Sequence, residues 1–323
     1  MATLNMNDQM TALELTKRQN APDPFHIIEL MRETNEMLVD VPAFEANNGT
    51  RNMAIQRSIK KIGEHRIYNS GVGKVATQTT KIEDRIAMME AYAEVDASMV
   101  KHTGNIEQAR RSEYIAIVKG MGLTQGETMI FGDGKKDEEF DGLMVRRNKI
   151  DDITTFDAGG RSNDNDMTSL YLCSIGREMF HFIYPKGAKN IGIERIDNGL
   201  ITIQDPNDAE KKYRVYQDWF SVEYGIAVII PESVIRIANI TKNMSGDALV
   251  EKIIEISYKV PKGASTYAMY SNDSILYKID KAAGNKGNVV HTREDPWGKP
   301  ITHIRNFRCR QMDVLAYTED RVM

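Results

Sequence analysis

The longest regular pattern of apolar positions in this chain has the period of an α-helix. Apolar side chains recur every three or four residues and form one stripe, made of Ile106, Ala109, Tyr114, Ile117, Val118 and Met121. Asn105 stands just before the stripe and Gln108 lies three residues later, a spacing typical of a capped helix N-terminus. Arg110 falls off the stripe. The pattern predicts a helix that ends at Phe131, where the turn Gly132-Asp133-Gly134 begins.

A second helical pattern runs from Asp23 to Asp40, before the long helix. Asp23 can cap this helix, Pro24 suits its first position, and Pro42 marks its end. Residues 1–22 are polar and mixed, with too few apolar side chains to pack on their own. We expect them to form an arm that becomes ordered only against a neighbouring subunit or another protein.

Residues 47–82 have a different pattern, because they are basic and poor in large apolar side chains. Three strand-like segments follow the turn at Asn47-Asn48-Gly49, namely Met53–Ile59, His65–Asn69 and Val75–Ile82. A segment of this length cannot bury a core by itself, so we interpret it as a long β-hairpin that needs a partner surface. An ordinary two-stranded edge within a domain is the alternative.

The hairpin carries the residues that we expect to contact another subunit. Its candidate basic contacts are Arg57, Lys60, Lys61, Arg66 and Lys74. Acidic partners for them follow the long helix, at Asp137, Glu138 and Glu139. Exposed ion pairs of this kind contribute only about 0–1 kcal/mol each, so they would matter through repetition across many copies.

The second half of the chain is rich in strand patterns, after an alternating segment at Met88–Asp96 that predicts a strand passing into a helix near Val100. Further strands are predicted at Ser169–Ser174, Met179–Tyr184, Leu200–Gln204, Lys212–Glu223, Ile226–Ile230, Val234–Ile240 and Ser265–Tyr270, with strand-like alternation over His303–Tyr317. Two helices are expected among them, at Asp247–Tyr258 and, capped by Asn272, through Ala283. The predicted fold class is therefore α+β.

Composition adds few constraints. The chain has 323 residues, of which 41% are hydrophobic and 27% are charged, which is ordinary for a globular protein. A net charge of −4 is too small to imply a nucleic-acid or membrane partner, and no apolar run approaches the roughly 20 residues of a membrane span. The two cysteines, Cys173 and Cys309, lie far apart and do not indicate a disulfide.

No catalytic pattern emerges from the chain. The six histidines show no paired metal spacing, and Glu178 and His181 would point to opposite faces of a strand. Asp164 and Asp166 lie in a loop that could bind a cation, although a solvated loop explains them better and the EF-hand pattern is missing. We therefore expect no catalytic residue, no cofactor and no metal site, and a hydrolase that uses this loop is a minor alternative.

One segment suggests a nucleic-acid-binding protein as the alternative function. Residues 286–310 combine basic side chains with Trp297 and Phe307, a composition typical of single-strand binding. Arg308 and Arg310 alternate on an expected strand, so a solvated strand face explains them equally well.

Several motifs along the chain are informative through their order and spacing. Those in the first half are Leu30-Met-Arg-Glu-Thr-Asn-Glu-Met-Leu-Val-Asp40, Pro42-Ala-Phe-Glu45, Met89-Glu-Ala-Tyr-Ala-Glu-Val-Asp96, Ile130-Phe-Gly-Asp133 and Glu139-Phe-Asp-Gly-Leu143. Those in the second half are Tyr184-Pro-Lys-Gly187, Tyr213-x-x-Tyr216, Trp219, Gly225-Ile-Ala-Val228 and Val234-Ile-Arg-Ile-Ala-Asn239. Together these motifs, over about residues 25–320, resemble a family of tailed-phage major capsid proteins of the podovirus type.

The resemblance implies the Hong Kong 97-like shell fold. In that fold the long helix is the spine of a peripheral domain, and the basic hairpin corresponds to the E-loop that lies over a neighbouring subunit. The implied division is an arm and helix at 1–46, the E-loop at 47–82, the peripheral domain at 83–165, the axial domain at 166–290 and closing strands at 291–323. No motif matches the Lys–Asn cross-linking chemistry of some relatives.

The same resemblance implies the function and the partners. We expect a structural protein that assembles with copies of itself into the hexamers and pentamers of an icosahedral phage head around double-stranded DNA. Scaffold, portal and decoration proteins are the further partners that it implies, with non-specific contact to packaged DNA and no membrane. The protein would be assembled in the host cytoplasm and would end up in the virion.

Overall fold

The computed structural model describes residues 31, 35–57, 65–73, 79–103, 105–136, 138–161, 166–188, 193–205, 208–285 and 303–323. Its strands are β1 Ala43–Glu45, β2 Arg51–Arg57, β3 Thr79–Arg85, β4 Ala87–Asp96, β5 Thr155–Asp157, β6 Met167–Ile175, β7 Phe180–Tyr184, β8 Ile193–Asp205, β9 Asp208–Val228, β10 Val234–Thr241, β11 Thr266–Ser271, β12 His303–Ile304 and β13 Phe307–Gln311. Its helices are α3 Met37–Asp40, α4 Ala97–Thr103, α5 Ile106–Phe131, α6 Leu143–Arg146, α7 Gly246–Ser257 and α8 Asp273–Asn285, with a 3-10 turn at Pro231–Ser233. The α+β class is confirmed.

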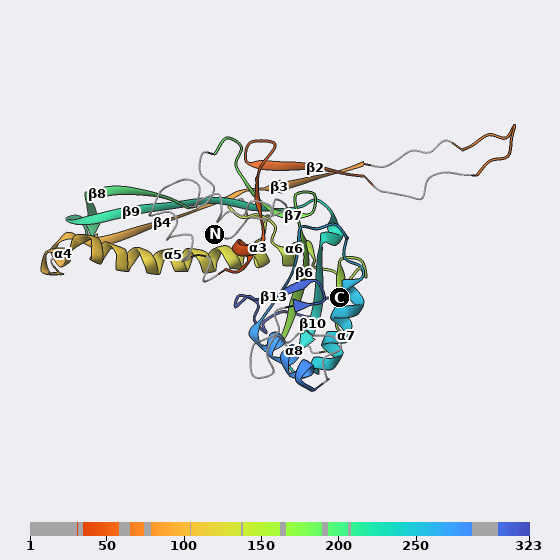
Figure 1. Ribbon diagram of the computed structural model, residues 1–323. Helices are drawn as coiled ribbons and strands as arrows, with labels where there is room; N and C mark the ends of the chain where they lie inside the picture. The colour runs from red at the N-terminus through yellow and green to blue at the C-terminus, as the bar shows by residue number, and fades with distance from the viewer. Residues whose placement is uncertain are drawn as a thin grey trace, which may run out of the picture.

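The molecule has three visible parts (Figure 1). A long arm consists of α5 beneath the strands β4, β9 and β8, and a more rounded body contains β6, β10, β13, α7 and α8. The hairpin of β2 and β3 projects away from both, on the side opposite the far end of the arm. Eleven of the described strands form one sheet that runs through the arm and the body. Seven follow the order β12-β13-β11-β6-β7-β9-β4, and four pair off this path: β1 with β7, β10 with β6, β5 with β10 and β8 with β9. The remaining two, β2 and β3, form a sheet of their own.

The body is built around β6, whose nine residues are all buried. Its alternate side chains face two different cores: Tyr171 and Cys173 pack toward the core shared with α5, and Leu170 and Leu172 pack toward α7 and α8. A strand covered on both faces reads as a continuous apolar run, which is why the sequence pattern alone shows a strand here but not which face meets which layer.

The predicted long helix is confirmed as α5. The Gln108 backbone N–H donates to Asn105 Oδ1 at 3.1 Å, so Asn105 is the N-cap, and the helix ends at Phe131. The predicted stripe is right from Tyr114 onward, but its first member, Ile106, is 43% exposed. The reason is that the first turn of α5 extends toward the outer end of the arm, beside α4 (Figure 1).

Several predicted elements agree closely with the structure, and some do not. The helices at α7 and α8 are confirmed, and the Ile275 N–H donates to the capping Asn272 Oδ1 at 2.9 Å. The predicted short strand Leu200–Gln204 is part of the 13-residue β8, and the two strands predicted around Gly225 are one 21-residue strand, β9. β9 continues through residues that look like strand ends in the sequence, because β4 and β8 pair with it along their whole lengths.

The first predicted helix and the middle strand of the hairpin require correction. Of the helix predicted from Asp23 to Asp40, the structure describes Met31 and residues 35–40. It is not continuous there, because Asn35 and Glu36 are not helical and the helix α3 starts only at Met37. His65–Asn69 is not a strand, because residues 65–67 are irregular and a turn follows in which Asn69 has a φ of 68°. The left-handed conformation at Asn69 reverses the chain, which an extended strand cannot do.

Candidate assembly surfaces

The hairpin pairs only with itself among the described residues. β2 and β3 are antiparallel in a register that joins Arg51 to Arg85 at one end and Arg57 to Thr79 at the other. The described tip, residues 65–73, lies far from the body (Figure 1) and is exposed throughout. Tyr68 is 96% exposed and Ile67 is 80% exposed. Apolar side chains so open to water indicate a surface that is covered by a partner.

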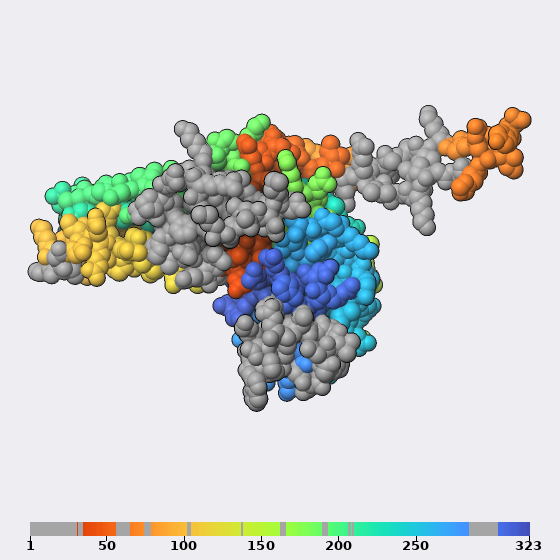
Figure 2. Space-filling model, in the orientation of Figure 1, coloured from red at the N-terminus to blue at the C-terminus, as the bar shows by residue number. Residues whose placement is uncertain are grey.

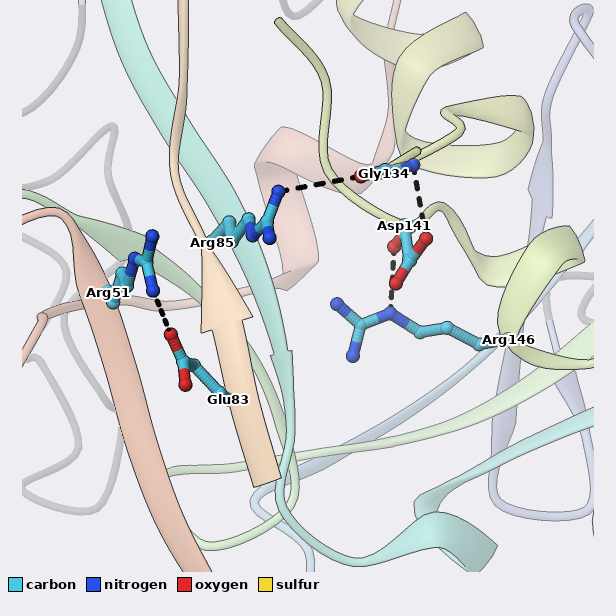
Figure 3. A pocket seen from close by; sticks show the side chains of 6 residues that line it. All are labelled: Arg51, Glu83, Arg85, Gly134, Asp141 and Arg146. Carbon is cyan, nitrogen blue, oxygen red and sulfur yellow. Dashed lines mark hydrogen bonds and ion pairs between the residues drawn. The ribbon is translucent and has the colours of Figure 1, made fainter. Parts of the chain in front are cut away.

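The root of the hairpin is tied to the body by arginine side chains around a polar pocket of about 330 Å³ (Figure 3). Arg146 from α6 donates to the buried carboxylate of Asp84 at 2.5 Å, and Arg85 of β3 donates to the Gly134 carbonyl of the loop after α5 at 3.5 Å. Burial raises the pKa of Asp84, and the positive charge of Arg146 opposes that rise. These contacts set the direction in which the hairpin leaves the body.

The acidic loop after α5 is held in shape by glycines. The Gly142 N–H donates to the Gly132 carbonyl at 2.8 Å and closes the loop. A Cβ on Gly132 would lie 2.5 Å from the Thr128 carbonyl oxygen and 2.6 Å from the Phe140 carbonyl oxygen, so no other residue fits without a backbone shift. Packing at the end of α5 therefore requires the glycine at the start of the turn Gly132-Asp133-Gly134 that the sequence predicted.

The predicted intersubunit residues are only partly described. Lys60, Lys61, Lys74 and Asp137 lie outside the described residues, and so does the side chain of Arg57. Arg66 is exposed at the hairpin tip, and Glu138 is exposed on the loop after α5. The role of all eight residues in subunit contacts stays a prediction.

Glu139 already has partners within its own loop. Its carboxylate accepts a hydrogen bond from the Asp133 N–H at 3.0 Å and forms an ion pair with Lys136 at 3.3 Å. The backbone hydrogen bond, followed by the Lys136 contact, lowers the pKa of Glu139. Its carboxylate is thus less available to another subunit than the sequence suggested.

Comparison with known proteins identifies the family. The family model for the major capsid protein GP7 matches residues 19–323. The chain belongs to this major capsid protein family. It is a structural protein that assembles with copies of itself into a bacteriophage capsid shell, and it is a component of the virion.

One solved structure shares the fold of this capsid protein. A chain of bacteriophage Epsilon15 is 22% identical, with 88% of each chain covered and a TM-score of 0.65. A capsid chain of bacteriophage JBD30 is 8% identical, with 84% of this chain and 88% of that chain covered and a TM-score of 0.49. The Hong Kong 97-like fold expected from the sequence motifs is confirmed. No curated protein sequence matches the chain.

The arm of this capsid protein is stiffened by an ion-pair cluster that the sequence pattern did not predict. Asp218 on β9 has a side chain that is 2% exposed, and its Oδ1 accepts hydrogen bonds from Arg110 of α5 at 2.8 Å and from Arg195 of β8 at 2.9 Å. Arg195 also stacks over the Tyr114 ring at 4.9 Å. Arg110 lies off the apolar stripe because it points at this buried carboxylate; no local signal could reveal a partner 108 residues away.

A groove of about 540 Å³ lies where β1 and β7 meet the hairpin root, and it contains His181. The side chain is nearly buried, packs edge-on against Phe44 at 5.1 Å between ring centroids, and its Nδ1 has no hydrogen-bond partner. Burial lowers the pKa of His181 to about 4, so the imidazole is neutral at physiological pH. Glu178 lies in the preceding turn, which agrees with a structural rather than a metal-binding histidine.

Residues 303–310 are the described part of the basic segment that was considered as a nucleic-acid site. Their side chains make contacts within the capsid protein. Arg308 and Arg310 have side chains that are 49% and 27% exposed, and both pair with the buried Asp40 of α3, at 3.3 Å and 2.6 Å. Phe307 is buried and packs against Tyr267. Residues 286–302, with Trp297, lie outside the described residues.

The remaining sequence candidates for chemistry form no site in the part of the chain that the structure describes. That part contains no cluster of three His, Cys, Asp or Glu side chains able to hold a metal ion, and Asp164 falls outside it. Cys173 and Cys309 are both free. None of the described helices is long and apolar enough to cross a membrane.

Proposed function

We propose that this capsid protein forms the pentamers and hexamers of an icosahedral phage head that encloses double-stranded DNA. The observation that carries the proposal is the hairpin, which leaves the body with outer strand edges that no other described strand pairs with and with an exposed apolar tip. Strand edges and apolar groups of this kind require cover, and a neighbouring subunit in a shell supplies it. In this assignment the hairpin is the E-loop, α5 is the spine helix, and α7 and α8 belong to the axial domain at the capsomer centre.

The peripheral domain in this proposal includes strands from two separate parts of the chain. We assign β4, β8 and β9 to it together with α5, because these elements pack on one another. The sequence-based division at residue 166 would place β8 and β9 in the axial domain instead. Scaffold, portal and decoration proteins, non-specific contact with packaged DNA and assembly in the host cytoplasm complete the proposal, and we expect no enzymatic activity.

The test is the size of the particles formed. Purified protein, alone or with its phage partners, should give pentamers, hexamers or closed shells in negative-stain images and in sedimentation velocity. Shells should form over a range of salt concentrations without added nucleic acid. A protein that stays monomeric and binds single-stranded DNA with a steep salt dependence would instead favour the nucleic-acid-binding alternative.

A further inference from the structure

A small pocket lies on the body beside the C-terminal end of α7. It has a volume of about 90 Å³ and lies between the segment that follows α7 and the turn that joins β12 to β13. α7 lies on the side of the body away from the arm (Figure 1). Lys262 and Arg305 line the pocket, and none of the described residues that line it is acidic. The pocket is therefore positively charged.

This positive charge is not neutralised by a neighbouring carboxylate. Lys262 and Arg305 are exposed, and so is Lys259, three residues before Lys262. None of these three cations forms an ion pair among the residues that the structure describes. Glu255, the last acidic residue of α7, is already paired with Lys252 at 3.2 Å. An anion from outside the chain would thus meet cations that have no counter-charge of their own.

Arg305 is held in a backbone conformation that arginine seldom adopts. Its φ is 54°, in the left-handed region that favours glycine and asparagine. Its guanidinium lies over the Tyr258 ring, 3.8 Å from the ring centroid, and donates a hydrogen bond to Ser257 Oγ at 2.7 Å. Strained positions that persist at an exposed charged residue point to a use for the position of that side chain.

The loop that carries Lys262 is fixed as well. Tyr267 Oη accepts hydrogen bonds from the Gly263 and Ala264 N–H groups, at 3.1 and 3.3 Å. The Tyr267 ring also packs edge-on against Phe307, with 5.4 Å between the ring centroids, and Phe307 follows the turn of Arg305. The two walls of the pocket are therefore held in place before any ligand binds, which lowers the entropic cost of binding.

The composition of the site favours nucleic acid over an acidic protein segment. Tyr258 is 71% exposed although Arg305 lies over its ring. An open aromatic ring among arginine and lysine side chains is typical of surfaces that contact nucleic acid, where the cations bind backbone phosphates. A carboxylate would satisfy the cations but gives no reason for the open ring.

We propose that Lys262 and Arg305 bind a phosphate group of the packaged double-stranded DNA, with Tyr258 positioning Arg305. This proposal rests on the proposed function as a DNA-filled head, and it names the surface of the subunit that meets the DNA. It requires this side of the axial domain to face the interior of the shell. Contacts to phosphates carry no sequence information, so the binding is non-specific and weak at each subunit.

The first test measures binding of a labelled DNA duplex of random sequence to the unassembled subunit by fluorescence anisotropy. Lys262→Gln/Arg305→Asn should weaken binding by roughly tenfold or more at about 0.05 M salt, and should reduce the slope of log K against log salt by about 1.8. Asparagine is used at position 305 because it tolerates a positive φ, so the charge is lost without added strain. An unchanged urea midpoint shows that the variant is folded.

The matched control removes two positive charges elsewhere on the surface. Lys211→Gln/Lys252→Gln changes two exposed lysines that are paired with Asp208 at 2.9 Å and Glu255 at 3.2 Å. Its net charge equals that of the pocket variant, and its salt slope should stay at the wild-type value. Equal losses for both double variants would mean a general effect of charge and would overturn the site.

The second test locates the pocket in DNA-filled heads. Tyr258→p-benzoylphenylalanine should form, on irradiation, a subunit–DNA adduct that nuclease treatment shortens. The control places the same photoreactive group at Tyr92 of β4, which is 53% exposed but has the exposed Glu90 and Glu94 on the same strand face. These carboxylates repel phosphate, so this variant should give little adduct.

The outcomes separate the inference from the assembly on which it depends. Heads that form normally but show no DNA adduct at Tyr258, or equal adducts at Tyr258 and Tyr92, overturn the site while the shell function stands. A link from Tyr258 to another protein means a protein partner at this pocket and also overturns it. The anisotropy test needs no shell, so selective loss of binding in a protein that never assembles would support the pocket and contradict the proposed shell.

Discussion

At the scale of single residues, a few buried carboxylates paired with arginines join separate elements of the described part of the protein. Asp218 joins α5 to β8 and β9, Asp84 joins the hairpin to α6, and Asp40 joins α3 to β13. A buried carboxylate of this kind costs solvation energy, so each is tolerated only because an arginine offsets its charge. Such contacts fix how the elements meet more than they add to net stability.

Asp218 offers a direct test of this view. Asp218→Asn should lower the free energy of unfolding of the unassembled subunit by about 3 kcal/mol, because two partly buried arginines lose their counter-charge. The measurement is the midpoint of urea unfolding at an unchanged slope. Asp197→Asn is the control: Asp197 pairs with the same Arg110 but its side chain is 53% exposed, so we expect a loss below about 1 kcal/mol. Equal losses for both variants would contradict the assigned role of burial.

At the scale of elements, the hairpin and the arm differ in how they are supported. The arm strands β4, β9 and β8 are covered on one face by α5, whereas β2 and β3 pair only with each other in the part of the chain that the structure describes. A two-stranded hairpin is marginally stable alone, so its order depends on what it meets in the assembly.

Reversal of the hairpin charge should therefore affect assembly and leave folding unchanged. We expect Lys60→Glu/Lys61→Glu to shift the thermal unfolding of the free subunit by less than about 2 °C, since exposed charges change stability by a few tenths of a kcal/mol. Shell yield in sedimentation should fall, most clearly at low salt. Lys60→Arg/Lys61→Arg keeps the charge and should assemble normally. A reversed variant that unfolds, while any surviving protein assembles, would place this segment in the core.

At the scale of the whole molecule, we expect the projecting hairpin to meet other copies of the chain, whereas the C-terminal segment packs within its own subunit. Only the body and the arm bury the large apolar clusters, and the hairpin projects beyond them (Figure 2). The C-terminal segment belongs to the body, because Val322 exchanges hydrogen bonds with Asn239 at 2.8 and 3.0 Å and Glu319 pairs with the buried Arg236.

Deletion of residues 1–20 tests the opposite end of the chain. These residues are too polar to contribute a core, so the truncated subunit should be soluble and folded, with an unfolding temperature close to that of the full chain. Its assembly into shells should be impaired, as judged by negative-stain images and sedimentation. Loss of the folded subunit on this deletion would show that the arm packs within its own chain.

The sequence by itself determined the elements whose signals are local. The caps at Asn105 and Asn272 and the glycine turn at Gly132 depend on residues within a few positions of each other, so their patterns predicted α5, α8 and the turn correctly. The ordered motifs along the chain also predicted the capsid family, because their spacing reflects the whole fold.

Tertiary structure alone decided what depends on partners far along the chain. The continuous 21-residue β9 exists because β4 and β8 pair along it, and its length cannot be seen in its own pattern. Arg110 and Arg310 look like surface charges in the sequence, yet each is largely covered and pairs with a buried carboxylate more than 100 residues away. Contacts at such separations are set by how the sheets and helices pack, and packing has no local signature.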